Sequence, residues 1–286
     1  MSTHPAAQTP NSSPSASTLE ARVRAEIAPF KGKVMLFAKN LDTGATYSLN
    51  GDERVRTAST IKVAIMVEAF AQVAAGKIKW SDQVTLTNAK KVSGSGLLQD
   101  LSDGLQLSLR DAVNLMIMVS DNTATNLVLD VITADAVNAR LDALGLKQTR
   151  SLRKVISGGE SRAWQDPDLR RFGLGVSTPR EMVTLLEKIE RGEVISPAAS
   201  KEMIDLLKRQ QLRDGIGRSL HGVPIASKPG SLDHLRSDVG IIYTPRGRIA
   251  MAITCEDIPE VDYSTDNPGL ILISHLSLIL MDGLGK

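Results

Sequence analysis

The sequence changes its periodicity twice, and these two changes most constrain the fold. Residues 33–40 and 45–49 are short and β-rich, and Asp42-Thr43-Gly44 between them is typical of a hairpin turn. From residue 59 to about residue 211, helical periods dominate and strand signals nearly vanish. Strand-like segments then return at residues 225–230, 238–243 and 249–255.

Strands near both ends of the chain predict an α+β fold. We expect an antiparallel sheet that both chain ends share, with the terminal helices packed on it and an all-helical lobe inserted. The sheet domain would comprise residues 17–56 together with 212–286, and the all-α lobe residues 57–211. Residues 1–16 are rich in Ser, Pro, Ala and Thr, which predicts a disordered leader. Small ligands usually bind in a cleft between two lobes.

Charge and composition exclude several function classes. The 286 residues carry 34 basic and 32 acidic side chains, and only 3% are aromatic, so we expect no nucleic-acid partner. The single cysteine excludes an internal disulfide. The four histidines show no metal-ligand spacing, so we expect neither a metal nor another cofactor. No segment is long and apolar enough to span a membrane, and we expect a monomer.

Ser59 and Lys62 are the first candidate catalytic pair. They open an apolar helical run, and residues three apart on a helix lie on one face. A helix N-terminus adds partial positive charge, which helps to hold down the pKa of a neighbouring amine. A hydroxyl beside such an amine can act as a nucleophile. The same Ser-x-x-Lys spacing recurs at Ser151 and Lys154, so the spacing alone does not identify the site.

Two further motifs follow in order along the chain. Ser120-Asp121-Asn122 lies where two predicted helices meet, and Lys228-Pro229-Gly230 lies at the end of a predicted strand. A Ser-Asp-Asn is most often a helix N-cap. Together with Ser59 and Lys62, the motifs and their spacing resemble the class A β-lactamases and penicillin-binding proteins. The resemblance covers roughly residues 19–283.

The resemblance implies a serine hydrolase with defined roles. Ser59 attacks a carbonyl, Lys62 is a candidate base, and Ser120 relays a proton to the leaving nitrogen. The backbone N–H groups of Ser59 and Ser231 would form the oxyanion hole. Lys228 is the fourth candidate catalytic residue and would place a positive charge near Ser120 and near the substrate carboxylate. Substrate binding is assigned to Asn122, Gly230, Ser231 and Arg236.

The first departure from this family is Pro229, which stands where the family has a hydroxyl residue. Ser231 could supply a substitute hydroxyl and Arg236 a substitute charge for the substrate carboxylate. The alternative for Arg236 is a solvated loop cation. A proline also lacks the N–H of a ladder bond, so its position must face an edge or a gap.

The second departure lies in the loop before Thr178. Class A enzymes carry a Glu there that activates the water for deacylation, whereas this chain has Arg153-Lys154-Val155. The nearest acids are Glu160, Asp166 and Asp168. If none of them reaches the site, the acyl-enzyme should be long-lived.

We therefore expect a serine hydrolase that is acylated at Ser59 by β-lactams and deacylates slowly. Two alternatives remain: a peptidase or esterase for D-alanyl or small acyl substrates on the same site, and a β-lactam or peptidoglycan sensor without turnover. The expected partner is a small molecule, a β-lactam or a D-alanyl peptide. The resemblance implies a periplasmic or secreted location, although residues 1–16 show no export signal.

Overall fold

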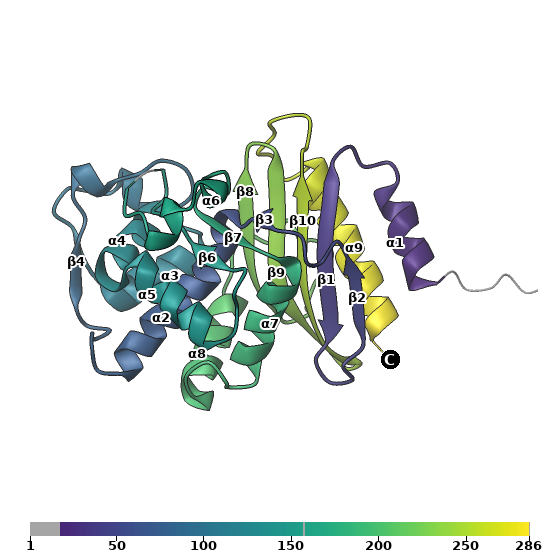
Figure 1. Cartoon of the computed structure of the whole chain (residues 1–286), viewed down its shortest axis with the longest axis horizontal. Coiled ribbons are helices and arrows are strands. Elements are labelled where there is room, and N and C mark those ends of the chain that lie inside the picture. The colour runs from purple at the N-terminus through teal and green to yellow at the C-terminus, as the bar shows by residue number, and fades with distance from the viewer. Residues whose placement is uncertain (1–17, 157, 286) are drawn as a thin grey trace, which may run out of the picture.

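Five antiparallel strands form the main sheet, in the order β2-β1-β10-β9-β8 (Figure 1). The computed structural model describes residues 18–156 and 158–285, so the predicted leader lies outside the described residues. The strands are β1 (Lys33–Asn40), β2 (Thr46–Leu49), β8 (Ile225–Leu232), β9 (Leu235–Thr244) and β10 (Gly247–Glu256). Strands β1 and β10 pair directly, with Phe37 opposite Ala252. The prediction of a sheet shared by both chain ends is confirmed.

Each face of the sheet has its own buried core, because side chains alternate along a strand. On β10, Ile249 and Met251 pack with helix α9, whereas Ala250 and Ala252 pack with the helices of the other face. Helices α1 (Leu19–Ile27) and α9 (Pro268–Leu284) contact each other on the first face. Helices α7 (Pro179–Glu190) and α8 (Pro197–Lys208) contact the sheet from the second face.

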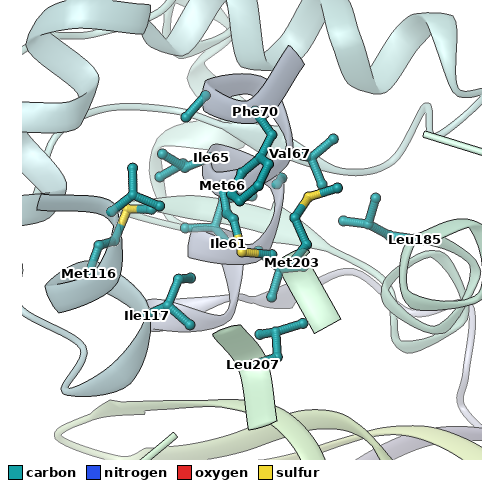
Figure 2. Close-up of a cluster of buried hydrophobic side chains, with 14 of the residues drawn as sticks. Ile61, Ile65, Met66, Val67, Phe70, Met116, Ile117, Leu185, Met203 and Leu207 are labelled. Atoms are coloured by element: carbon teal, nitrogen blue, oxygen red, sulfur yellow. The ribbon is translucent and has the colours of Figure 1, made fainter. Parts of the chain in front are cut away.

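The remaining helices lie beside the β8 edge, in the left half of Figure 1. They are α2 (Lys62–Ala74), α3 (Leu109–Met118), α4 (Asn122–Ile132), α5 (Ala134–Ala143) and the short α6 (Pro167–Arg170). Helix α2 is buried along most of its length, and Figure 2 shows its residues Ile65 and Met66 surrounded by side chains of neighbouring helices. Met116 of α3 and Met203 of α8 belong to this cluster. The core therefore fixes the position of the turn that precedes α2.

Sequence periodicity missed the short strands inside the helical stretch. Strand β7 (Gly175–Ser177) pairs with β3 (Val55–Arg56) and with β6 (Arg150–Ser151), and β4 (Gln83–Thr85) pairs with β5 (Gln106–Ser108). Strands of two or three residues are too short to show a period of two. The division into lobes near residue 211 stays a prediction, since α7 and α8 pack on the sheet.

Four short 3₁₀ turns complete the described elements: η1 (Ala58–Ile61), η2 (Asn88–Lys90), η3 (Leu98–Asp100) and η4 (Arg162–Gln165). Turn η1 joins directly onto α2 and contacts β8 and β9. It thus lies between the helices and the sheet. Across residues 18–156 and 158–285, no helix combines the length and apolar character that crossing a bilayer requires.

Candidate active site

A cavity of about 550 Å³ opens where η1, the loop before α4 and the end of β8 meet. Six of the eight predicted site residues line it: Ser59, Ser120, Asn122, Gly230, Ser231 and Arg236. The other two, Lys62 and Lys228, are fully buried. Three distant parts of the chain therefore converge on one cavity of a size suited to a small molecule.

Ser59 lies in a 3₁₀ turn rather than in the first turn of an α-helix. Helix α2 begins at Lys62, whose backbone N–H donates to the carbonyl of Ser59. Ala58 and Ile61 are buried on either side, and Ala58 has a φ of 46°. A positive φ is costly for a residue with a side chain, so tertiary packing imposes this backbone. The turn leaves Ser59 on the cavity wall.

The close approach of β8 to η1 explains the glycine at position 230. A Cβ at Gly230 would lie 2.9 Å from the carbonyl oxygen of Thr57 and 3.0 Å from the backbone nitrogen of Ser59. These distances are too short for a side chain, so only glycine lets the strand pass so near to the Ser59 N–H.

Lys62 makes three hydrogen bonds at the base of the cavity. Its Nζ lies 2.7 Å from the Ser120 carbonyl oxygen, 3.2 Å from Ser120 Oγ and 3.0 Å from Asn122 Oδ1. Its hydrogen bonds within the described residues do not include Ser59. Burial lowers the pKa of Lys62 well below its usual value, and the positive charge of Lys228 lowers it further, whereas Asp121 opposes the shift.

The three contacts can be made by an ammonium that donates all three hydrogen bonds or by a neutral amine, the form that burial favours. A neutral amine has two N–H donors, which the Ser120 carbonyl and Asn122 Oδ1 can accept, and one lone pair, to which the Ser120 hydroxyl can donate. In this form Lys62 can accept a proton, as a general base must. A proton can thus pass between Lys62 and the hydroxyl of Ser120.

The Ser-Asp-Asn motif serves both as a helix cap and as part of the cavity. Asp121 is the N-cap of α4: its Oδ1 accepts from the Ala124 N–H, and its Oδ2 accepts from the N–H groups of Leu97 and Leu98. Ser120, with a φ of 57°, and Asn122 flank this cap. The cap interpretation therefore holds for Asp121, while its two neighbours hold Lys62.

Lys228 is fully buried on β8, and its Nζ donates to the Pro229 carbonyl at 2.9 Å. Burial lowers its pKa to about 7, and the charge of Asp238 opposes that shift. Asp238 lies opposite Pro229 on β9 and is also buried, which raises its pKa to about 7. These pKa shifts could not be predicted from the sequence, because the burial of both residues depends on the whole sheet.

Arg236 is a buried cation, so the alternative of a solvated loop residue is wrong. Its guanidinium donates to the carbonyls of Leu232, Leu235 and Asp262 and lies 4.7 Å from the centre of the Tyr263 ring. Burial lowers its pKa from the usual value. The three carbonyls hold the side chain in place in the wall of the cavity that it lines.

Pro229 fits on β8 because β8 is an edge strand of the main sheet. Its ring nitrogen cannot donate a ladder bond, so it must face away from β9. Ser231 comes two residues later on the same strand, opposite Arg236, and we infer that its N–H points the same way. That direction is the free edge, next to the cavity that Ser231 lines.

None of the three acids proposed for deacylation, Glu160, Asp166 and Asp168, lines the cavity. All three are exposed, and Asp166 caps α6. Val155 lines the cavity instead, and Asn126 clamps its backbone: the Asn126 amide donates to the Val155 carbonyl at 3.3 Å, and Val155 N–H donates back at 2.8 Å.

The sequence missed one acid that does line the cavity. Asp214 belongs to the loop between α8 and β8, where no motif distinguishes it. The competing Ser-x-x-Lys pair does not form a site: Ser151 is buried on β6, and Lys154 forms an ion pair with Asp130. Within residues 18–156 and 158–285, no three His, Cys, Asp or Glu side chains are grouped to hold a metal ion.

Comparison with known sequences assigns this chain to a protein family. Residues 18–284 match the family described as "Beta-lactamase enzyme family". The chain belongs to the β-lactamase enzyme family. The resemblance inferred from the three motifs is thereby confirmed, and the protein is a β-lactamase-like serine hydrolase.

Relatives of this β-lactamase-family protein cover most of its length. β-Lactamase AER-1 of Aeromonas hydrophila is 25% identical over 78% of this chain and 72% of its own. The crystal structure of a β-lactamase from Sphaerobacter thermophilus is 32% identical with a TM-score of 0.81, covering 93% of this chain and 97% of that one. A PBP-A mutant, solved as an acyl-enzyme complex with penicillin G, is 28% identical with a TM-score of 0.79, covering 92% and 95%.

Proposed function

We propose that this protein opens β-lactam rings by acylation of Ser59. The observation that carries the proposal is the buried cluster of Lys62 with Ser120 and Asn122 at the base of the cavity that Ser59 lines. The Ser59 oxygen forms a bond to the lactam carbonyl carbon, and the carbon–nitrogen bond of the ring then breaks. The product is an ester of Ser59 whose leaving nitrogen stays attached to the substrate.

The proton of the Ser59 hydroxyl moves to Lys62, which burial favours in its neutral form. Lys62 passes a proton to Ser120, and Ser120 protonates the ring nitrogen as it leaves; the 3.2 Å contact between Lys62 Nζ and Ser120 Oγ supports this route. The backbone N–H groups of Ser59 and Ser231 stabilise the oxyanion of the intermediate.

The substrate carboxylate binds near Ser231 and Arg236. The Ser231 hydroxyl replaces the hydroxyl that Pro229 removes, and the buried guanidinium of Arg236 supplies charge. Lys228 adds its charge from within β8 when it is protonated. Asn122 orients the substrate amide from the cavity wall, and Gly230 leaves room for the substrate beside η1.

Deacylation is slow because the loop residues that line the cavity, Arg153, Val155 and Ile156, include no acid. A valine cannot take a proton from the attacking water, and the three nearby acids are exposed and outside the cavity. The PBP-A relative whose mutant was solved as an acyl-enzyme with penicillin G is consistent with a persistent ester.

The test is a chromogenic cephalosporin added to the purified protein, followed by intact mass. We expect a stoichiometric burst, an adduct of one substrate mass, and slow release, all abolished by Ser59→Ala. Rapid turnover with no adduct would overturn slow deacylation. Cleavage of D-alanyl or simple esters without any β-lactam adduct would favour the peptidase or esterase.

A sensor without turnover is the second candidate, and the same absence of an acid at Val155 favours it. An adduct that persists for as long as the protein is folded would support the sensor. In either case we propose a monomer that acts on a β-lactam or a D-alanyl peptide, in the periplasm or after secretion, the locations that the family resemblance implies.

A further inference from the structure

The cavity contains more positive charge than one substrate carboxylate requires. Besides Arg236, three arginines line it: Arg56, Arg153 and Arg171. Asp214 is the one acidic side chain among the described lining residues. Arg56 is neutralised by Glu256, with Nε 3.2 Å from Oε1. The charges of Arg153 and Arg171 are therefore the ones that need an explanation.

Arg153 and Arg171 belong to two chain segments, one after β6 and one before β7, and these segments lie side by side. The N–H of Leu152 donates to the carbonyl of Leu174 at 2.9 Å, which brings residues 153 and 173 together. A Cβ built on Gly173 would lie 3.8 Å from Arg153 Nη2. Arg171 precedes Gly173 by two residues, so both arginines line the part of the cavity formed by this segment.

No carboxylate of the described chain pairs with either arginine. Arg153 donates through Nη1 to the carbonyls of Lys154 and Ile156 and lies 5.4 Å from the centre of the Trp164 ring. Arg171 lies 4.7 Å from the centre of the Phe172 ring. These contacts orient both side chains but leave guanidinium N–H donors free, since each group has five.

Two cations that line one cavity without a paired carboxylate raise its positive potential, and an anion bound there lowers that potential. Guanidinium groups bind carboxylate and phosphate well because their N–H groups match the geometry of these anions. A single substrate carboxylate bound at Ser231 and Arg236 leaves Arg153 and Arg171 without an anion. The neighbouring lining residues Val155 and Ile156 are apolar and suit the uncharged part of an acyl group.

We propose that Arg153 and Arg171 form a second anion subsite, so that the preferred substrates carry a negative group in their acyl part as well as the usual carboxylate. This inference rests on the proposed acylation of Ser59. The substrate class is a dianionic acyl donor: a β-lactam with a carboxylate in its side chain, or a D-alanyl peptide with an acidic side chain.

The test compares carbenicillin with benzylpenicillin, which differ by one carboxylate in the acyl side chain. Acylation rates are measured by intact mass for the unchanged protein and for the double variant Arg153→Gln/Arg171→Gln. We expect the unchanged protein to prefer carbenicillin and the double variant to lose about five- to tenfold on carbenicillin, the size of one partly exposed charge-assisted hydrogen bond. Benzylpenicillin rates should change less than about twofold on this scale.

Arg162→Gln is the matched control, because Arg162 lies in the same segment but outside the cavity and pairs with Asp135 at 3.3 Å. It should leave the preference unchanged. Equal losses on both penicillins in the double variant would overturn the subsite and leave Arg153 and Arg171 as supports of the loop. The preference should also weaken as salt is added, since the site is open to solvent.

A binding measurement separates this inference from the proposed function. In Ser59→Ala, equilibrium binding of both penicillins is measured by calorimetry with and without the two arginine changes. A carbenicillin preference that the arginine changes abolish supports the subsite, and no preference overturns it. Failure of both penicillins to acylate the unchanged protein would overturn only the proposed function.

Discussion

Lys62 illustrates at the scale of one residue how burial creates a base. A solvated lysine is charged at neutral pH, whereas Lys62 has no exposed surface and a positive neighbour in Lys228. Both effects disfavour the ammonium form. In the mechanism that we propose, this amine takes the proton of the Ser59 hydroxyl.

Replacing Lys62 with arginine removes the proposed base. Arginine stays protonated in proteins and cannot accept a proton, so Lys62→Arg should lower the acylation rate by roughly 10²–10⁴-fold. The measurement is the acylation rate with benzylpenicillin by quenched intact mass, with circular dichroism to confirm that the variant is folded. A folded variant that is acylated at the original rate would show that Lys62 is not the base.

Val155 is the residue to which we attribute the slow deacylation that we propose. Val155→Glu places a carboxylate at the loop position that the Asn126 clamp holds at the cavity. We expect the lifetime of the acyl-enzyme to fall by about 10²-fold or more, the usual contribution of a general base. The neutral variant Val155→Gln is the control and should keep the long lifetime. Equal lifetimes for the two variants would contradict this account.

The acylation rate should fall as the pH rises through neutrality, because of the titration of Lys228 and Asp238. The pKa of Lys228 is lowered to about 7, so its positive charge is present below pH 7 and lost above it; Asp238, with a pKa raised to about 7, becomes negative over the same range. Both changes weaken binding of a substrate carboxylate as pH rises. Lys228→Arg keeps the charge and should flatten this fall in a pH profile of the acylation rate, whereas an unchanged fall would rule out Lys228 as its source.

At the scale of elements, the N-terminus of α4 fixes the catalytic cluster. Asp121 accepts from three backbone N–H groups, two of them in the segment that opens η3. Asp121→Ala should lower the free energy of unfolding by about 1–3 kcal/mol, because it removes the cap and leaves buried donors unpaired. Urea unfolding measures this loss, and Ser108→Ala, which removes the exposed cap of α3, is the control with an expected loss nearer 1 kcal/mol. If the two losses were equal, Asp121 would be an ordinary cap.

The elements also show what a sequence can predict. Strand β1 has the bounds predicted from the sequence, because period and turn residues are local signals. Cap residues are local signals too: Thr178 caps α7 and Ser196 caps α8. Strands β3, β6 and β7 were missed, since their pairing joins segments that are far apart in the sequence.

At the scale of the whole molecule, both chain ends contribute to one sheet, and the buried α2 positions η1 against its edge. Motif order alone was enough to predict that Ser59, Ser120 and Gly230 share a cavity. The burial of Arg236 and the place of Asp214 could not be predicted, because both depend on which surfaces the complete fold covers. The same holds for the presence of both Arg153 and Arg171 on the wall of the cavity.

The most direct test of the central claim is to locate the covalent adduct. The protein is incubated with benzylpenicillin, digested, and sequenced by tandem mass spectrometry. We predict one penicilloyl group per chain, attached to the peptide that contains Ser59 and absent from Ser59→Ala. A penicilloyl group on another residue, or none on a folded protein, would contradict the account.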